Sequence, residues 1–168
     1  MKMLSLYRIL TYILLPIAGI FGAIDILFLF AGLAQPALLL GVFILAAMVI
    51  YVFISFIFLS KGIERSIPLK PSTKDWLKVN AYVTVGFVAL NIIQAIGLLR
   101  SDATVKQVIT DSIAMQGAKL PPGYTIESLM KIIRGAIYFL LTFSGILLIH
   151  LSITFRLLKA YAHVFDKE

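Results

Sequence analysis

Three long runs of apolar residues dominate the pattern along the chain. The first, Ile9 to Ser60, holds one charged side chain in 52 residues, Asp25, while Val79–Leu99 and Gly135–Phe155 hold none. Runs of about 18 or more apolar residues are typical of membrane-spanning helices. As one helix the first run would be about 78 Å long, but the hydrocarbon core is only about 30 Å thick, so this run must turn once. The pattern predicts an all-α membrane protein, a single four-helix transmembrane bundle over residues 1–168.

Glycine and proline mark the places where these helices end and begin. Gly32 and Pro36 bracket the turn within the first run, because both residues are strong breaks in helical patterns. Ser72 and Asp75 have the spacing of a capping box, which predicts that the third helix starts near Thr73. The predicted spans are about 8–33, 36–59, 78–99 and 133–157, with a linker over 60–77 and an outer loop over 100–132.

The distribution of lysine and arginine predicts the orientation. The N-terminal tail, the linker and the C-terminal end carry ten basic residues between them, and the Arg100–Arg134 loop carries five beside three acids. Because Lys and Arg collect on the cytoplasmic side, we expect both termini in the cytoplasm and this loop outside, in a plasma (bacterial inner) membrane. The start of the chain resembles a signal peptide, but its apolar stretch is too long for one, so we expect an uncleaved first helix.

The outer loop has a helical pattern of its own. Ser101 can cap a helix over Asp102–Gln116, with Gly117 as its stop, and Thr125 can cap the fourth helix. One face of the segment is mostly apolar, at Val105, Val108, Ile109, Ser112, Ile113 and Gln116. Two interpretations stay open, an amphipathic helix on the outer membrane interface and a lid packed on the outer end of the bundle.

Composition narrows the function classes. The chain is 61% hydrophobic and 14% charged, against about 45–50% and about 25% in soluble domains. The membrane explains the net charge of +7 better than nucleic acid does. The absence of cysteine excludes disulfides, thiolate metal sites and cysteine nucleophiles. Two histidines make no convincing metal site, and no catalytic or cofactor-binding motif is present, so we expect no enzyme, no cofactor and no metal.

Asp25 is the most unusual residue, because a carboxyl group within a membrane span is costly and usually faces the protein interior. It lies on a stripe of small residues that favours close helix packing. Counted from the middle of each span at 1.5 Å per residue, Asn91 and Gln94 lie within about 3 Å of its depth. These two amides share a helix face with Thr84. We expect Asp25 to meet Asn91 or Gln94, either as structural glue or as a ligand or proton site.

His150 and the linker complete the candidate residues. The depth count puts His150 about 6 Å toward the inner side of its span, with Thr154 one turn away. A lone intramembrane histidine is more often a packing residue than a ligand. The basic residues of the linker either set the topology or contact anionic lipid head groups. They are Lys61, Arg65, Lys70, Lys74 and Lys78.

The residues favour a non-enzymatic membrane protein, either a homo-oligomer or an accessory subunit of a larger complex. The alternative is a small transporter or channel-like protein that uses Asp25, Asn91 and Gln94. The surroundings of Asp25 discriminate between them, because a water-filled path would favour transport and a dry packed contact would favour assembly.

Overall fold

The computed structural model describes residues 2–115 and 123–165, which form helices joined by short connections. The elements are α1 (Lys2–Ala34), η1 (Pro36–Leu38), α2 (Leu39–Ile57), η2 (Phe58–Ile63), α3 (Pro71–Leu99), α4 (Asp102–Met115), α5 (Ile126–Ala160) and η3 (Ala162–Phe165). Within the described ranges, four helices are long and apolar enough to cross a membrane: Lys2–Ala34, Pro36–Ile63, Pro71–Leu99 and Ile126–Ala160. The predicted all-α fold with four membrane-spanning helices is therefore confirmed.

The chain divides into two compact units, Met1–Val88 with Ile146–Glu168 and Ala89–Gly145. We refer to them as the first and second unit. Helices α3 and α5 contribute to both. The expected single domain over residues 1–168 stays a prediction.

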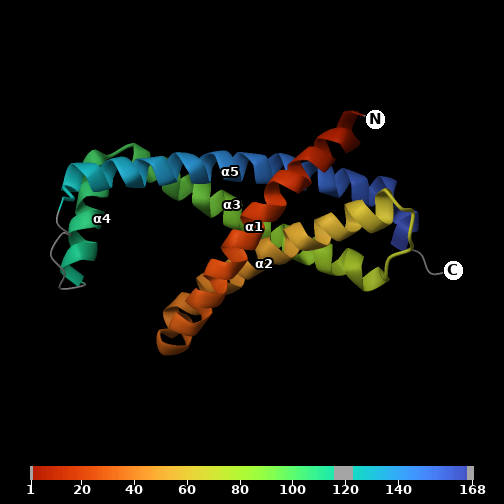
Figure 1. Cartoon of the computed structure of the whole chain (residues 1–168), viewed down its shortest axis with the longest axis horizontal. Helices are drawn as coiled ribbons and strands as arrows, with labels where there is room; N and C mark the ends of the chain where they lie inside the picture. Colours follow the sequence, from red (N-terminus) through yellow and green to blue (C-terminus); the bar gives the residue numbers. More distant parts are fainter. Residues whose placement is uncertain (1, 116–122, 166–168) are drawn as a thin grey trace. The chain divides into compact units, whose positions relative to one another are not determined.

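In the first unit, α1 and α2 form an antiparallel hairpin (Figure 1). The predicted turn lies where it was expected, with Gln35 N–H donating to the Ala31 carbonyl at 3.0 Å and Pro36 opening η1. A Cβ on Gly32 would lie 2.7 Å from Leu39 Cδ2, so this glycine lets the chain double back closely. The stripe of small residues on α1 faces α2, because a Cβ on Gly22 would contact Val49 at 3.3 Å.

The core of the first unit contains residues from all four long helices. Tyr7 of α1, Tyr51 of α2, Leu77 of α3 and Leu147 of α5 are fully buried. Removal of such large side chains from water is the main favourable term in a soluble fold, whereas in a bilayer close van der Waals packing takes over that role.

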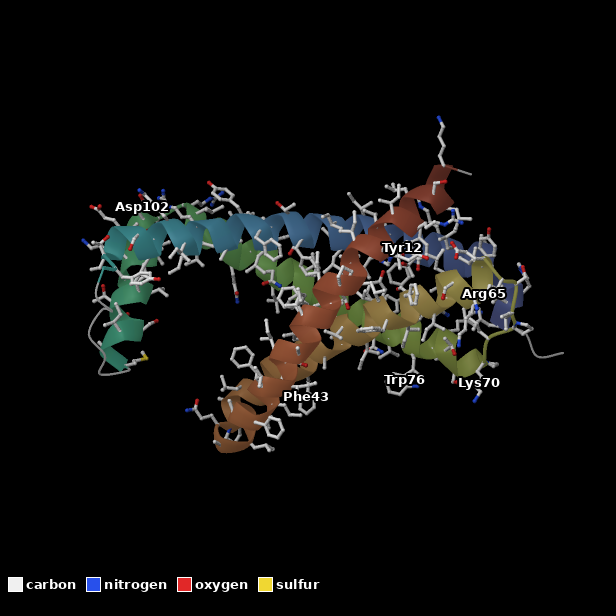
Figure 2. The ribbon with its side chains drawn as sticks, viewed as in Figure 1. Tyr12, Phe43, Arg65, Lys70, Trp76 and Asp102 are labelled. Atoms are coloured by element: carbon white, nitrogen blue, oxygen red, sulfur yellow. The ribbon has the colours of Figure 1, made fainter. Side chains whose placement is uncertain are left out.

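One end of the first unit collects the chain segments outside the predicted spans. Arg8 Nε lies 2.6 Å from Glu64 Oε1, which joins the start of α1 to the linker. Leu69 N–H donates to the Val164 carbonyl at 2.8 Å, which joins the linker to η3. Figure 2 shows Arg65, Lys70 and Trp76 at this end, and Trp76 is 58% exposed, as suits an interfacial anchor.

Several helix boundaries differ from the predicted ones. The second span continues through a π-helical segment to Ile63, so the linker begins later than residue 60. Helix α3 begins at Pro71, and Ser72 therefore lies inside its first turn and is not its cap. Proline suits that first position because it lacks the N–H that the first turn leaves unpaired.

The second unit holds α4 and the adjoining parts of α3 and α5. Ser101 Oγ accepts from Thr104 N–H at 3.2 Å, and Thr125 Oγ1 accepts from Ser128 N–H at 3.1 Å, so both predicted caps are confirmed. The predicted helix in the outer loop is confirmed over Asp102–Met115. The predicted end at Gln116 and stop at Gly117 lie outside the described residues.

The expected apolar face of α4 is only partly covered. Val105 and Ile109 are buried, but Val108 is 48% exposed. The start of α4 is held by an ion pair between Asp102 and Arg134 of α5. The protein itself covers the Val105–Ile109 pair, one turn apart, and does not cover Val108, so the choice between a lid and an interfacial helix stays open.

Candidate functional site

Asp25 lies on the face of α1 that packs toward α2, in line with the buried residues Ala18 and Gly32. Its side chain reaches a groove of about 270 Å³ in the first unit. The other lining residues are apolar and include Phe28, Leu38, Val42, Leu45 and Phe87. We call this feature the Asp25 groove.

Asp25 is buried, with 8% of the residue exposed. Its Oδ1 atom has no hydrogen-bond partner among the described residues of the first unit. A buried polar atom without a partner costs free energy, and more so in hydrocarbon than in a wet interior. A hydrogen-bond donor placed beside Oδ1 would therefore stabilise this site.

The three residues expected near Asp25, which are Thr84, Asn91 and Gln94, belong to different units of the structure. Thr84 is buried in the first unit, where its hydroxyl donates to the Asn80 carbonyl of its own helix at 2.7 Å. Asn91 and Gln94 belong to the second unit. The expected contact between Asp25 and these amides stays a prediction.

His150 belongs to a second polar site, a buried cluster that joins three helices. Thr11 Oγ1 of α1 lies 2.9 Å from His150 Nε2, and Tyr51 Oη of α2 lies 2.6 Å from Nδ1. Tyr51 Oη also lies 2.8 Å from Thr154 Oγ1. The ring of Tyr7 stacks on the imidazole with centroids 4.6 Å apart. We call these five residues the His150 cluster.

Both ring nitrogens of His150 can be hydrogen-bonded in either neutral tautomer of the imidazole. With the proton on Nε2, the ring donates to Thr11, which donates to the Tyr7 carbonyl, and Tyr51 donates to Nδ1. With the proton on Nδ1, the ring donates to Tyr51, Tyr51 donates to Thr154, and Thr11 donates to Nε2. A histidine has one donor and one acceptor nitrogen when neutral, and both are engaged here. The cluster thus connects α1, α2 and α5 inside an apolar core.

The two polar sites are separate. Thr11 and Asp25 are 14 residues apart on α1, which corresponds to about 21 Å along a helix axis. The depth argument that kept His150 away from Asp25 agrees with this separation.

Three members of the His150 cluster, Tyr7, Thr11 and Tyr51, were not among the candidates from the sequence; only Thr154 was paired with His150 there. A signal for them was present, because Tyr7 and Thr11 are one turn apart on one face, as are His150 and Thr154.

Of the five linker residues expected at lipid head groups, Lys74 and Lys78 line a groove between α3 and α5 in the first unit. Lys159 of α5 joins them there. Lys61, Arg65 and Lys70 do not line this groove.

Comparisons with protein-family models, with curated proteins and with solved structures found no match. Function is therefore inferred from the side chains of this chain alone.

Proposed function

We propose that this protein is a non-enzymatic subunit of a membrane assembly, and that the Asp25 groove receives a transmembrane helix of a partner subunit. The observation that carries the proposal is the buried Oδ1 atom without a donor at an apolar groove. The occupant is a helix that brings a hydrogen-bond donor, an amide, hydroxyl or amine, to the depth of Asp25. Intramembrane polar groups commonly find such partners on neighbouring helices.

The lining of the groove supports assembly over transport. Apart from Asp25, its walls are aliphatic and aromatic side chains, which offer no polar steps for an ion or a water chain. Large apolar side chains near the α1–α2 turn are also exposed, among them Leu27, Leu33 and Leu40 at 70–71%. Such a surface suits contact with lipid or with another apolar helix.

The test is the size of the protein in mild detergent, compared among variants of Asp25. We expect the wild type to migrate above the 18.6 kDa of one chain, and Asp25→Leu to weaken association by about 1–2 kcal/mol, the range of polar contacts in model membrane helices. Asp25→Asn should associate nearly normally, because an amide still donates and accepts.

A matched control is Phe43→Leu on α2, which changes an exposed side chain that does not line the groove. A wild-type protein extracted from its membrane with neither a second copy nor another subunit bound, or an Asp25→Leu variant that associates as well as the control, would contradict the proposal. Unchanged assembly combined with loss of ion flux in Asp25→Asn would favour the transport alternative instead.

A further inference from the structure

The groove between the start of α3 and the end of α5, which we call the lysine groove, has a volume of about 450 Å³. Its lining residues are Lys74, Lys78, Tyr82, Phe155, Leu158 and Lys159, with Ala162 at its end. All belong to the first unit. The groove therefore combines three cationic side chains with an aromatic and aliphatic wall.

The register of the two helices sorts these side chains into two levels. The rings of Tyr82 and Phe155 lie 5.3 Å apart and mark one level. Lys78 precedes Tyr82 by four residues and Lys159 follows Phe155 by four, in helices that run in opposite directions. One helical turn is about 5.4 Å. Lys78 and Lys159 therefore start from the same height along the two helices, about one turn beyond the ring pair. Lys74 is one further turn out, with its Nζ 5.7 Å from the ring of Phe165.

The positive charges of the lysine groove are not neutralised by the described acids. Within the described ranges, Arg8 pairs with Glu64 and Arg134 pairs with Asp102, and neither ion pair involves these lysines. Asp75, the acid nearest in sequence, borders a different surface with Trp76 and Val79. Lys74 and Lys78 are half-buried, so their alkyl stems lie along the protein while the ammonium groups reach outward.

We propose that the lysine groove binds one anionic phospholipid, with its phosphate between Lys78 and Lys159 and an acyl chain along Tyr82, Phe155 and Leu158. In a phospholipid the negatively charged head group is directly attached to apolar acyl chains. The groove has the matching arrangement, with lysines next to an apolar wall. Lys74 adds a third cation at the head-group side. A soluble phosphate would leave the ring pair and Leu158 without an apolar ligand. This site is independent of the Asp25 groove, because the two share no lining residue.

The test uses a tryptophan placed in the groove. Trp76 is the single tryptophan of the chain, so the double variant Trp76→Phe/Tyr82→Trp carries one reporter beside Phe155. The full-length protein is reconstituted into phosphatidylcholine vesicles that contain a minor fraction of lipid brominated on its acyl chains. That lipid is either phosphatidylglycerol or phosphatidylcholine, and bromine quenches tryptophan fluorescence at short range. We expect stronger quenching by the brominated phosphatidylglycerol.

Variants that remove lysines inside or outside the groove then distinguish binding at a defined site from general attraction of anionic lipid to a basic surface. Lys78→Gln/Lys159→Gln should lower the preference for brominated phosphatidylglycerol by about fivefold for each lysine, the worth of one basic residue near an anionic surface. Lys61→Gln/Lys70→Gln removes the same charge outside the groove and should leave the preference nearly unchanged. Emission maxima of the reporter, equal in both pairs of variants, verify that the groove is intact.

Three outcomes would overturn the proposal. They are equal quenching by the two brominated lipids, an equal loss of preference in both pairs of variants, and reversal of the preference by millimolar inorganic phosphate at constant ionic strength. The first denies binding, the second shows a diffuse surface potential, and the third shows a site for a soluble anion. A misfolded reporter variant is replaced by Phe155→Trp, which places the indole on the opposite wall.

Discussion

Tyr51 Oη lies 2.6 Å from His150 Nδ1, and the two residues are 99 positions apart in the chain. Through this contact α2 and α5 share a hydrogen bond in a core where both side chains are fully buried. The same hydroxyl lies 2.8 Å from Thr154 Oγ1, so one oxygen atom serves two partners.

Tyr51→Phe should therefore destabilise the fold. The substitution keeps the ring but leaves His150 Nδ1 and Thr154 with one partner fewer, which costs about 1–3 kcal/mol when the groups stay buried. The measurement is unfolding by a denaturing detergent titrated into mild-detergent micelles. Tyr12→Phe is the control, because the ring of Tyr12 is half exposed and contacts Phe56 by its edge. Equal unfolding midpoints for the two variants would show that the cluster contributes nothing.

Gly62→Ala should destabilise the end of α2 at which the C-terminal segment docks. A Cβ at this position would lie 2.9 Å from Val164 Cγ1 and 3.0 Å from Leu69 Cδ1, so the side chains of Val164 and Leu69 would have to shift. At Gly86 nothing lies within 4 Å of the added atom. Gly86→Ala should be neutral or stabilising by up to about 1 kcal/mol, because alanine favours helices over glycine. Detergent unfolding of both variants checks the prediction, which fails if their effects have the same sign.

The orientation can be tested with reporter fusions at Ser112 and Glu168. The count of basic residues predicts a cytoplasmic C-terminus and an outer position for residues 100–132. An enzyme that is active only in the cytoplasm should work at Glu168 and fail at Ser112. Activity at Ser112 would reverse the orientation.

Labelling of single cysteines can distinguish a lid from an interfacial helix for α4. The chain has no cysteine of its own, so Val105→Cys, Val108→Cys and Ile109→Cys each carry one thiol. If α4 is a lid on the protein, a water-soluble maleimide should label position 108 much faster than the buried positions 105 and 109. If α4 lies in the membrane interface, lipid should protect position 108 as well. Equally fast labelling at all three positions would contradict both interpretations.

The sequence predicts the membrane helices well because their signal is long and local. An apolar run of about twenty residues is long enough to cross the bilayer as a helix. Caps such as Thr125 also bond to the first turn of their own helix, so they can be recognised from nearby residues. The π-helical end of α2 was not predictable in this way. Within this segment Gly62 lies close to Val164, which is about 100 residues later in the chain, and a local pattern does not reveal such a contact.

The candidate sites were harder to predict because they depend on which faces of the helices meet. His150 was expected to be a hydrogen-bonded packing residue, and its bonds to Thr11 and Tyr51 have that form. Its tyrosine partners were not found, because tyrosine counts as apolar in a hydropathy pattern although its hydroxyl can bond. For Asp25, buried and without a donor in its own unit, no pattern within one span identifies the partner.

Photo-crosslinking from the Asp25 groove tests the proposed assembly most directly. A photoreactive amino acid at Leu45, a lining residue, should form a covalent adduct in native membranes with a transmembrane peptide, from this chain or another subunit, identified by mass spectrometry. The same group at Ile20, which is 64% exposed outside the groove, should give mainly lipid adducts. Asp25→Leu should abolish the peptide adduct at Leu45. Lipid adducts alone at Leu45, or a peptide adduct that persists in Asp25→Leu, would contradict the proposed docking of a partner helix at Asp25.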